Sequence, residues 1–472
     1  MVRVALINPP IRTKQPPMHP PYGIALLAAI ADQEGYEVVV LDVNAFRLHH
    51  EVVRSELRSE KPIDIIGIGG FIPSYRWIKF ILPFLRRDFP DSLFVVGGGA
   101  MTALQEDMMK WCPEIDVGVI GEGEKTFLEL LRHVEKGVPD LKQIKGILYR
   151  EDDEIVRTPP RPLMAEEELD ELPYPKFDLL PLEEVYWKYS PIAFSPEALQ
   201  SKRRLPILSS RGCPMACKFC SDTLAGCSRT NYDPSKGAKV RFHSARYVVE
   251  MMKWMRMRYA VDFINFLDEC FTANRKRVYE LCDLIIEEGL NEVVKWGCTA
   301  HPIHVDPELL SVLKEAGCTY LDLGFESGDD RVLREMRKGS TVERNRRVLK
   351  WCIRAGINPI TNFIWGFPSD DLQSIYNTVT FWRDNGIICQ PFWLAPYPKT
   401  QYFEEHRERI LEQYDGDLEK FVMALEADTD TMVVNLTKFD DPTIIGLREL
   451  AIRHDLKRIK RYAEKMGVKL DE

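Results

Sequence analysis

Short apolar runs alternate with amphipathic stretches along two long parts of this 472-residue chain, and no other feature restricts its fold as much. In the first part, the apolar runs are VRVALIN, YEVVVLDV, IDIIGIGGF, SLFVVGGG and IDVGVIGEGE. Strands this apolar, separated by helices, are typical of a parallel sheet covered on both faces. We therefore expect an α/β fold with an N-terminal doubly wound (Rossmann-like) domain over residues 1–140.

A second series of predicted strands occupies residues 201–400. Its apolar runs are LPILSS, DFINFLD, VKWGCTA, YLDLGFE, NPITNFIWGF and QPFWLAPY, with helical stretches between them. Consecutive βα units imply a parallel sheet curved toward a barrel, with its chemistry at the carboxyl ends of the strands. We predict a partial (β/α)6 TIM-like barrel in this part of the chain.

A segment over residues 141–200 joins the two series. It starts with a hairpin-like stretch, GILYREDDEIVRTPP, and continues with five prolines between Pro159 and Pro175. Since proline interrupts regular structure, we expect an extended connector there. The last part, residues 401–472, is predicted to be helical. One apolar stripe along it consists of Ile452, Leu456, Ile459, Ala463 and Met466.

Composition excludes several classes of function. The net charge of −9 and the pI of about 5.7 give no global reason to expect nucleic-acid binding. The start, MVRVALINPP, has the pattern of a core strand rather than of a signal peptide. Because no uninterrupted apolar run is long enough to cross a bilayer, we expect no transmembrane segment and a cytoplasmic location.

Three of the 11 cysteines, Cys213, Cys217 and Cys220, lie close together in the stretch SSRGCPMACKFCSD. In a reducing compartment, such a cluster indicates a metal centre or a catalytic site rather than disulfides. Zinc fits poorly, because it takes four ligands and the nearest further candidate, Cys227, comes too late for the usual spacing. Closely spaced thiolates hold iron–sulfur clusters, and three protein ligands leave one iron of a cubane open.

The Cys-x3-Cys-x-aromatic-Cys loop, with Phe219 before the last cysteine, resembles the signature of radical S-adenosylmethionine enzymes. The resemblance implies a [4Fe-4S] cluster on Cys213, Cys217 and Cys220, which serve as both metal ligands and catalytic residues. It also implies S-adenosylmethionine on the open iron, with reductive cleavage to a 5′-deoxyadenosyl radical. In such enzymes the cofactors carry the difficult chemistry, while the protein positions them and excludes water.

Motifs on the later barrel strands extend this resemblance. FLDECF contains Asp268 and Glu269, and LGFESG contains Glu326, at positions where the family contacts S-adenosylmethionine; FIWGFP and APYPKT resemble its later segments. Phe219 would also contact this cofactor. Carboxylates suit a ligand that is cationic at sulfur and nitrogen. The alternatives are that Asp268 and Glu269 cap a helix, and that Glu326 is only structural.

Two further residues near these strand ends have open roles. His301, in TAHPIHVDPELL, stands where related proteins often carry arginine, and it either reaches substrate or cofactor or is structural. Cys270 directly follows Asp268 and Glu269, so it is placed to face the cavity. The remaining cysteines of the barrel, in apolar runs, are interpreted as core: Cys282, Cys298, Cys318, Cys352 and Cys389.

The first domain resembles the cobalamin-binding subclass of the same family, through INPP, VVGGGAMT, IGEGEKTF and the connector motif LDELPYPKFDLL. Asn-Pro-Pro after the first strand counts against a nicotinamide cofactor, which favours G-x-G-x-x-G. The resemblance implies cobalamin contacts at the strand ends: Gly69, Gly70, Tyr75, Gly97, Gly98, Gly99, Gly121 and Glu122. Tyr75 and Arg76 either lie over the corrin or begin the next helix. The chain has no Asp-x-His-x-x-Gly motif, so no histidine is implied on cobalt.

Taken together, these motifs predict a radical S-adenosylmethionine enzyme that methylates an unactivated carbon of a small molecule or of a natural-product or lipid intermediate, with cobalamin. The alternative is a non-methylating radical cyclisation, rearrangement or C–C coupling of a tetrapyrrole, lipid or nucleoside. A non-catalytic corrinoid or iron–sulfur carrier is a third class. An electron donor such as a flavodoxin or ferredoxin is the expected partner. Aromatic residues near the sixth strand either line a pocket or belong to the core: Phe392, Trp393 and Tyr397.

Overall fold

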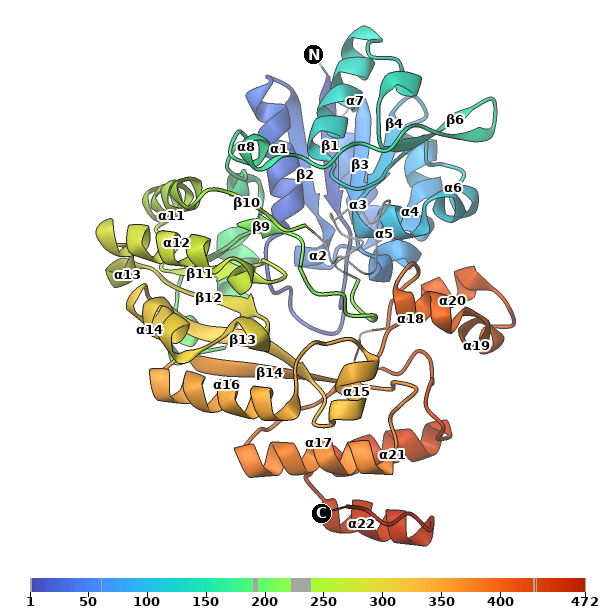
Figure 1. Ribbon diagram of the computed structural model, residues 1–472. Coiled ribbons are helices and arrows are strands. Elements are labelled where there is room, and N and C mark those ends of the chain that lie inside the picture. The colour runs from blue at the N-terminus through green and yellow to red at the C-terminus, as the bar shows by residue number, and fades with distance from the viewer. Residues whose placement is uncertain are drawn as a thin grey trace.

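Two β-sheets with their covering helices make up the molecule (Figure 1). The computed structural model describes residues 2–60, 62–189, 194–221, 239–427, 429 and 431–471. In Figure 1 the first sheet occupies the upper part, in blue and cyan, and the second lies below it, in green to orange. The short strands β9 (Ser210–Arg211) and β10 (Arg241–Phe242) lie between the two sheets and pair antiparallel with each other.

The first sheet has the strand order β2-β1-β3-β4-β5-β6-β7. Its strands are β1 (Arg3–Asn8), β2 (Glu37–Asp42), β3 (Ile65–Gly69), β4 (Leu93–Gly97), β5 (Val117–Val119), β6 (Ile147–Glu151) and β7 (Glu154–Arg157). The pairs among β1 to β5 are parallel, as the apolar runs predicted. The hairpin that the sequence places in the connector is β6–β7, and it extends this sheet because β6 pairs antiparallel with β5.

Helices cover both faces of the first sheet. They are α1 (Tyr22–Gln33), α2 (Val43–Phe46), α3 (His50–Ser59), η1 (Ile72–Ser74), α4 (Tyr75–Asp88), α5 (Gly98–Leu104), α6 (Glu106–Trp111), α7 (Glu124–Lys136) and η2 (Leu141–Gln143). Within β1, Val4 and Leu6 belong to the core under α1 and α7, while Ala5 and Ile7 belong to the core under α3 and α4. This alternation confirms the doubly wound architecture, since each strand buries side chains on both faces.

The second sheet is entirely parallel, in the order β15-β14-β13-β12-β11-β8. Its strands are β8 (Arg204–Ile207), β11 (Phe263–Phe266), β12 (Lys295–Ala300), β13 (Cys318–Glu326), β14 (Asn358–Trp365) and β15 (Phe392–Trp393). The helical elements between them are α11 (Ala245–Tyr259), η6 (Phe271–Ala273), α12 (Arg275–Glu287), α13 (Leu290–Val293), η7 (Pro302–His304), α14 (Pro307–Glu315), α15 (Asp330–Glu335), α16 (Val342–Ala355) and α17 (Leu372–Asn385). All six predicted strands are confirmed in their predicted order, and they form the open half-barrel.

Short elements connect the two sheets within residues 158–203: α8 (Glu166–Leu169), η3 (Phe177–Leu179), η4 (Leu182–Tyr186), α9 (Trp187–Tyr189) and α10 (Pro196–Gln200). Aromatic side chains from this part pack on both neighbours, as expected for the connector. The ring of Phe177 lies 6.2 Å from Tyr22 of α1 and 6.3 Å from Tyr259 of α11. The hydroxyl of Tyr186 donates a 2.6 Å hydrogen bond to Asp42 at the end of β2.

The C-terminal part is helical, as predicted: α18 (Gln401–Glu405), α19 (Arg407–Glu412), α20 (Leu418–Ala424), α21 (Asp441–Ile452) and α22 (Leu456–Lys465). The single stripe predicted across it is wrong in two respects. The helix is interrupted at His454, which has a left-handed φ of 54°, and Asp455 caps α22 by accepting from the amide of Arg458. Ile459 and Ala463 are buried, but Met466 lies beyond the end of α22 with 60% of its surface exposed.

The C-terminal helices contact both sheets. Figure 1 shows α18 to α20 beside the helices of the first sheet, while α21 lies beside α17 and α22 lies below it. Tyr402, Phe403 and Phe421 share one apolar core with Ile72 and Tyr75 of the first domain. Within the described residues, none of the helices has the length and apolar character needed to cross a membrane.

Candidate cofactor site

The three cysteines lie on the loop that follows β9, between the two sheets. Cys217 is buried, and Cys213 and Cys220 are half-buried. The amide of Lys218 in the loop donates a 3.1 Å hydrogen bond to the carbonyl of Met336, so the loop is attached to the segment after α15. Among the described residues, no three His, Cys, Asp or Glu side chains lie close enough together to hold a single metal ion.

Asp268 and Glu269 bind the backbone that leads into the cysteine loop. Asp268 is 1% exposed, and its carboxylate accepts hydrogen bonds from the amide and hydroxyl of Ser209, both at 2.6 Å, and from the amide of Ser210 at 3.2 Å. Glu269 accepts from the amide of Gly212 at 3.0 Å. The side chain that caps α12 is Asn274. The two carboxylates therefore orient the backbone that leads into Cys213, and their contact with S-adenosylmethionine stays a prediction.

Glu326, the predicted carboxylate at the end of β13, forms a buried ion pair with Lys338. The Lys338 Nζ lies 2.9 Å from Glu326 Oε1, and both side chains are less than 10% exposed. Gly324 leaves space for this pair, since a Cβ there would lie 2.2 Å from Glu326 Oε1 and 2.7 Å from Lys338 Nζ. The chain at Glu326 has a left-handed φ of 62°, which turns its carboxylate back over the strand end.

Lys338 carries a positive charge next to the cysteine loop, and sequence reasoning missed it. Burial alone would lower the pKa of Lys338, but the charges of Glu326, Cys217 and Cys220 raise it above its ordinary value. An ammonium in this position favours the thiolate forms of nearby cysteines, which are the forms that bind iron. No signal in the sequence identifies it, because it stands 12 residues after Glu326 on a separate turn.

His301 has a structural role in this arrangement. Its Nε2 lies 2.8 Å from the carbonyl of Lys338, and its Nδ1 accepts from the amide of Ile303 at 3.3 Å. Burial, followed by the charge of Lys338, lowers the pKa of His301 to about 3. The ring is therefore neutral at pH 7, and it fixes the backbone that carries Lys338. Cys270 lies within hydrogen-bonding reach of Cys213; this contact raises the pKa of Cys213 and lowers that of Cys270.

Aromatic packing attaches the cysteine loop to the end of β14. The ring of Phe219 lies 5.9 Å from that of Phe367 in an edge-to-face contact. Asp370 accepts from the amides of Gly366 and Phe367, at 2.9 and 3.0 Å, and so fixes the turn in FIWGFP. Burial raises the pKa of Asp370 to about 7. Phe219 thus has a protein neighbour, and its predicted contact with S-adenosylmethionine is untested.

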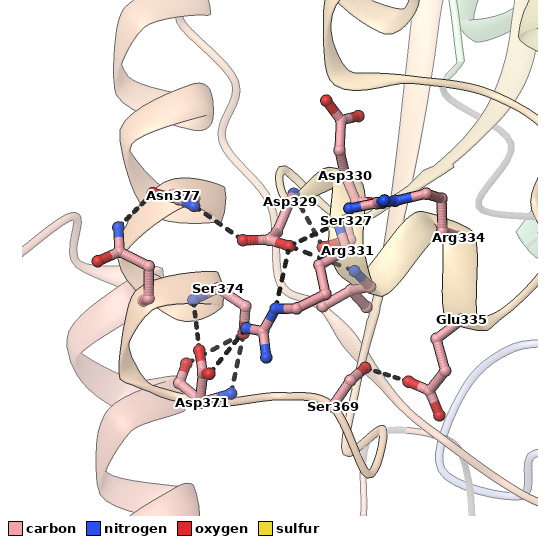
Figure 2. A network of polar contacts seen from close by, with 12 residues as sticks. Ser327, Asp329, Asp330, Arg331, Arg334, Glu335, Ser369, Asp371, Ser374 and Asn377 are labelled. Carbon is pink, nitrogen blue, oxygen red and sulfur yellow. Dashed lines mark hydrogen bonds and ion pairs between the residues drawn. The ribbon is translucent and has the colours of Figure 1, made fainter. Parts of the chain in front are cut away.

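A polar network stabilises the turn after Glu326 (Figure 2). Asp329 caps α15 through the amides of Arg331 and Val332, and it accepts a 2.8 Å hydrogen bond from Asn377 on α17. The guanidinium of Arg331 lies 2.7 Å from the carboxylate of Asp371, which caps α17. Figure 2 shows these side chains converging between the two helices. The network therefore joins the segments that carry Glu326 and Phe367.

The predicted glycines of the first domain lie at the carboxyl ends of β3 to β5. Gly98 has a φ of +78°, and a Cβ there would lie 2.8 Å from the carbonyl of Gly70, so these two loops touch through their backbones. Around Gly121 and Gly123 a Cβ would meet nothing within 4 Å. Phe71, 57% exposed, lies against Gly99, where a Cβ would be 3.3 Å from its ring. Sequence reasoning missed Phe71, although it directly follows the paired glycines.

Three other residues that the sequence places near cobalamin have protein partners. Tyr75 begins α4, is fully buried, and donates a 2.5 Å hydrogen bond to Glu419 of α20. This burial favours the packing interpretation of Tyr75 over a contact with a corrin. Arg76 forms an exposed ion pair with Glu426. Glu122 is buried and accepts from two arginines of the second domain, Arg211 at 2.9 Å and Arg241 at 2.8 Å.

The inner face of the half-barrel is accessible, whereas its outer face is not. On β13 and β14, the inward-facing Asp322, Gly324, Asn362 and Ile364 are half-buried, whereas the following outward-facing residues are buried: Leu321, Leu323, Phe325, Phe363 and Trp365. At the amino ends of the half-barrel strands, the stacked rings of Phe263 and Tyr320 fill the interior of the half-barrel. A polar layer lies above them: Asn362 donates to Asp322, and Tyr320 donates to Asn265 at 2.8 Å.

Two groups of this layer have unusual properties. Burial raises the pKa of Asp322 to about 6. Asn265 is 2% exposed, and its Nδ2 has no hydrogen-bond partner among the described residues. Buried polar groups without a partner are rare.

Comparison with known proteins agrees with this geometry. Residues 207–381 match the model of the radical SAM superfamily, and residues 10–131 match the B12 binding domain. The uncharacterized methyltransferase PH0819 of Pyrococcus horikoshii is 30% identical over 86% of this chain and 83% of its own length. The chain belongs to the cobalamin-dependent radical S-adenosylmethionine family.

Two further proteins resemble this family member. The anaerobic magnesium-protoporphyrin IX monomethyl ester cyclase of Cereibacter sphaeroides is 27% identical, over 85% of this chain and 63% of its own length. The structure of the radical S-adenosylmethionine methyltransferase TsrM from Kitasatospora setae, with cobalamin and a [4Fe-4S] cluster bound, covers 87% of this chain and 76% of that chain. Its TM-score is 0.67 and its identity 20%, which confirms the fold.

The residues of this radical S-adenosylmethionine protein fit the cofactors of its family. Cys213, Cys217 and Cys220 supply three thiol ligands, the number that leaves one iron of a [4Fe-4S] cluster open. The buried ammonium of Lys338 lies near Cys217 and Cys220. The exposed ring of Phe71 and the open space around Gly121 and Gly123 suit a large flat ligand such as cobalamin. The glycines lie at carboxyl ends of parallel strands, and the cysteine loop follows the carboxyl end of the parallel strand β8 by way of β9, where ligands of such sheets bind.

Proposed function

We propose that this protein methylates an unactivated carbon of a small molecule. The observation that carries the proposal is that the carboxyl ends of both sheets face one region, with the cysteine loop between them and the open half-barrel beside it. Relatives named as methyltransferases support the same reaction class. When bound, the three cofactors of the family supply a one-electron reductant, a carbon radical and a methyl group.

The chain's own residues contribute binding and positioning. Cys213, Cys217 and Cys220 hold the cluster. The Lys338 ammonium favours the thiolate forms of Cys217 and Cys220, and Glu326 balances its charge inside the protein. Asp268 and Glu269 fix the backbone before Cys213 and present carboxylates near the cationic cofactor. The open space beside Gly121 and Gly123 would allow a corrin ring to approach the strand ends of the first sheet closely, whereas Gly70, Gly98 and Gly99 pack against protein atoms.

The polar layer of the half-barrel indicates the kind of substrate. Asp322 lies half-buried on the inner face, and because burial raises its pKa to about 6, its carboxyl group can both donate and accept hydrogen bonds near neutral pH. Ile364 and Phe392 provide apolar surface near the carboxyl end. We therefore propose a substrate with an uncharged hydroxyl or amide group and an apolar part. A flavodoxin or ferredoxin is the proposed electron donor.

A radical cyclisation is the second candidate. The cyclase of Cereibacter sphaeroides resembles this chain over most of its length, so the shared architecture suits that reaction as well. The two candidates differ in whether a methyl group from S-adenosylmethionine enters the product.

The test uses the anaerobically reconstituted holoprotein with a strong reductant and S-adenosylmethionine labelled with 13C in its methyl group. A small-molecule extract of the cells that make the protein is the source of substrate, and the variant Cys217→Ala is the control. A product that contains the labelled methyl on carbon, and that is absent with Cys217→Ala, is expected. Formation of 5′-deoxyadenosine with only unlabelled, rearranged products would replace methylation with the cyclisation candidate.

A further inference from the structure

A buried set of four charges joins the two cofactor-binding loops. Glu122 belongs to the loop between β5 and α7 of the first domain and Glu124 is the first residue of α7, whereas Arg211 and Arg241 belong to β9 and β10. Arg211 donates to Glu122 at 2.9 Å and to Glu124 at 2.6 Å, and Arg241 donates to Glu122 at 2.8 Å. All four side chains are at most 11% exposed. We call this set the interdomain clamp.

Charge balance explains why the interdomain clamp is stable. Arg211 and Arg241 are directly opposite each other in the β9–β10 pair, and like charges in that position repel. Glu122 lies between them and contacts both guanidinium groups, and Glu124 supplies the second negative charge. The other oxygen of Glu122 accepts from the amide of Met164, so the connector is also attached. Removing one member leaves an uncompensated charge in the interior.

The interdomain clamp contacts both loops directly. On one side, Glu122 lies between Gly121 and Gly123, the open glycines at the carboxyl end of β5. On the other side, Arg211 precedes Cys213 by two residues, and the strand that carries it is fixed by Asp268 and by Arg277, which donates to the carbonyl of Ser209 at 3.0 Å. A rigid path of side chains therefore runs from the cobalamin loop to the cluster loop.

We infer that Glu122, Glu124 and Arg211 are positioning residues that set the separation and orientation of the corrin relative to the iron–sulfur cluster. Glu122 then acts through Arg211 and not as a ligand of cobalamin. Two other contacts of the first domain do not touch the two loops: Tyr75 and Lys79 bind Glu419 of the tail, and Lys125 binds Glu168 of the connector. These contacts attach the domains to each other, whereas the interdomain clamp also fixes the cofactor loops.

The test measures the magnetic coupling between reduced cluster and cob(II)alamin, both of which are paramagnetic. Pulsed electron paramagnetic resonance of the holoprotein gives the distribution of this dipolar coupling, which falls with the cube of the separation. In Glu124→Gln and in Glu122→Gln, we expect normal iron and cobalt contents but a broader and shifted distribution. Glu168→Gln is the matched control, because it removes an exposed ion pair of the same helix, and it should leave the distribution unchanged.

The outcomes separate this inference from the proposed function, on which it rests. Unchanged coupling in both clamp variants would overturn the inference and leave the function standing. A wild-type protein without a cob(II)alamin signal would overturn both. If Glu122→Gln does not fold, Glu124→Gln decides the question, since it removes a single contact and leaves Arg211 bound to Glu122. A shift that also occurs in Glu168→Gln would show general loosening of the domains and would likewise overturn the inference.

Discussion

At the scale of single residues, some side chains of the site could be identified from their spacing in the sequence, and others only from the folded structure. The three cysteines were predictable because a short loop brings them together whatever the rest of the fold does. Lys338 and Arg211 were not, since their partners Glu326 and Glu122 are reached only through tertiary packing. Glu122 was predicted to bind cobalamin from its place at a strand end, yet burial gives it two arginines as partners. A strand-end position shows where a residue lies but not what it contacts.

Replacement of Lys338 tests the buried ion pair. Lys338→Met leaves the Glu326 carboxylate uncompensated in the interior, and we expect a loss of about 3–5 kcal/mol in the free energy of unfolding. Urea unfolding of the purified protein measures this loss. The double variant Glu326→Gln, Lys338→Met should recover most of it, because no buried charge remains. A single variant as stable as the wild type would show that the pair is not buried in solution.

Histidine burial predicts how stability depends on pH. The folded protein holds His301 with a pKa of about 3, below its ordinary value of 6.5. Between these values the unfolded chain binds a proton that the folded protein does not, so this contribution is complete above pH 6.5 and is lost as the pH falls. From pH 7.5 to pH 5.0, His301 should account for about 2 kcal/mol of lost stability.

The variant His301→Gln isolates this contribution, because the other titrating groups are the same in both proteins. Its free energy of unfolding should fall less steeply than that of the wild type over the same pH range. Parallel curves for the two proteins would mean that folding leaves the pKa of His301 unchanged.

At the scale of elements, periodicity predicted the strands and helices well and their pairing less well. All the apolar runs became strands because apolar side chains on both faces suit a covered parallel sheet. The β6–β7 hairpin was recognised, but its attachment to β5 was not, since strand pairing depends on residues distant in sequence. The break at His454 was missed, although Asp455 is a good cap for α22, because the apolar stripe continues across it.

Packing of α20 on the first domain can be tested with Phe421. Its ring is fully buried and stacks on Phe403 at 5.8 Å, in the core that these helices share with α4. We expect Phe421→Ala to lower the free energy of unfolding by about 3–5 kcal/mol, the usual result of removing a buried aromatic ring. Phe46, 50% exposed, is the control, and Phe46→Ala should change stability by less than about 0.5 kcal/mol. Equal effects of the two substitutions would contradict the shared core.

At the scale of the whole molecule, the fold brings two binding surfaces together. The sequence predicted two parallel sheets with their sites at the strand ends, and family resemblance predicted a cofactor for each. How the sheets face each other was not predictable, because the interdomain clamp and the C-terminal helices form only when both domains are folded. The substrate also depends on this level, since the polar layer of Asn265, Asp322 and Asn362 draws on three different strands.

The central claim is that one chain holds a cluster and a corrinoid at the same time. After anaerobic reconstitution with iron and sulfide, incubation with hydroxocobalamin and desalting, the wild-type protein should retain about four iron atoms and about one cobalt atom. The variant Cys213→Ala, Cys217→Ala, Cys220→Ala should lose the iron and keep the cobalt, because its first domain is unchanged. Iron retained without cobalt in the wild type would contradict the account.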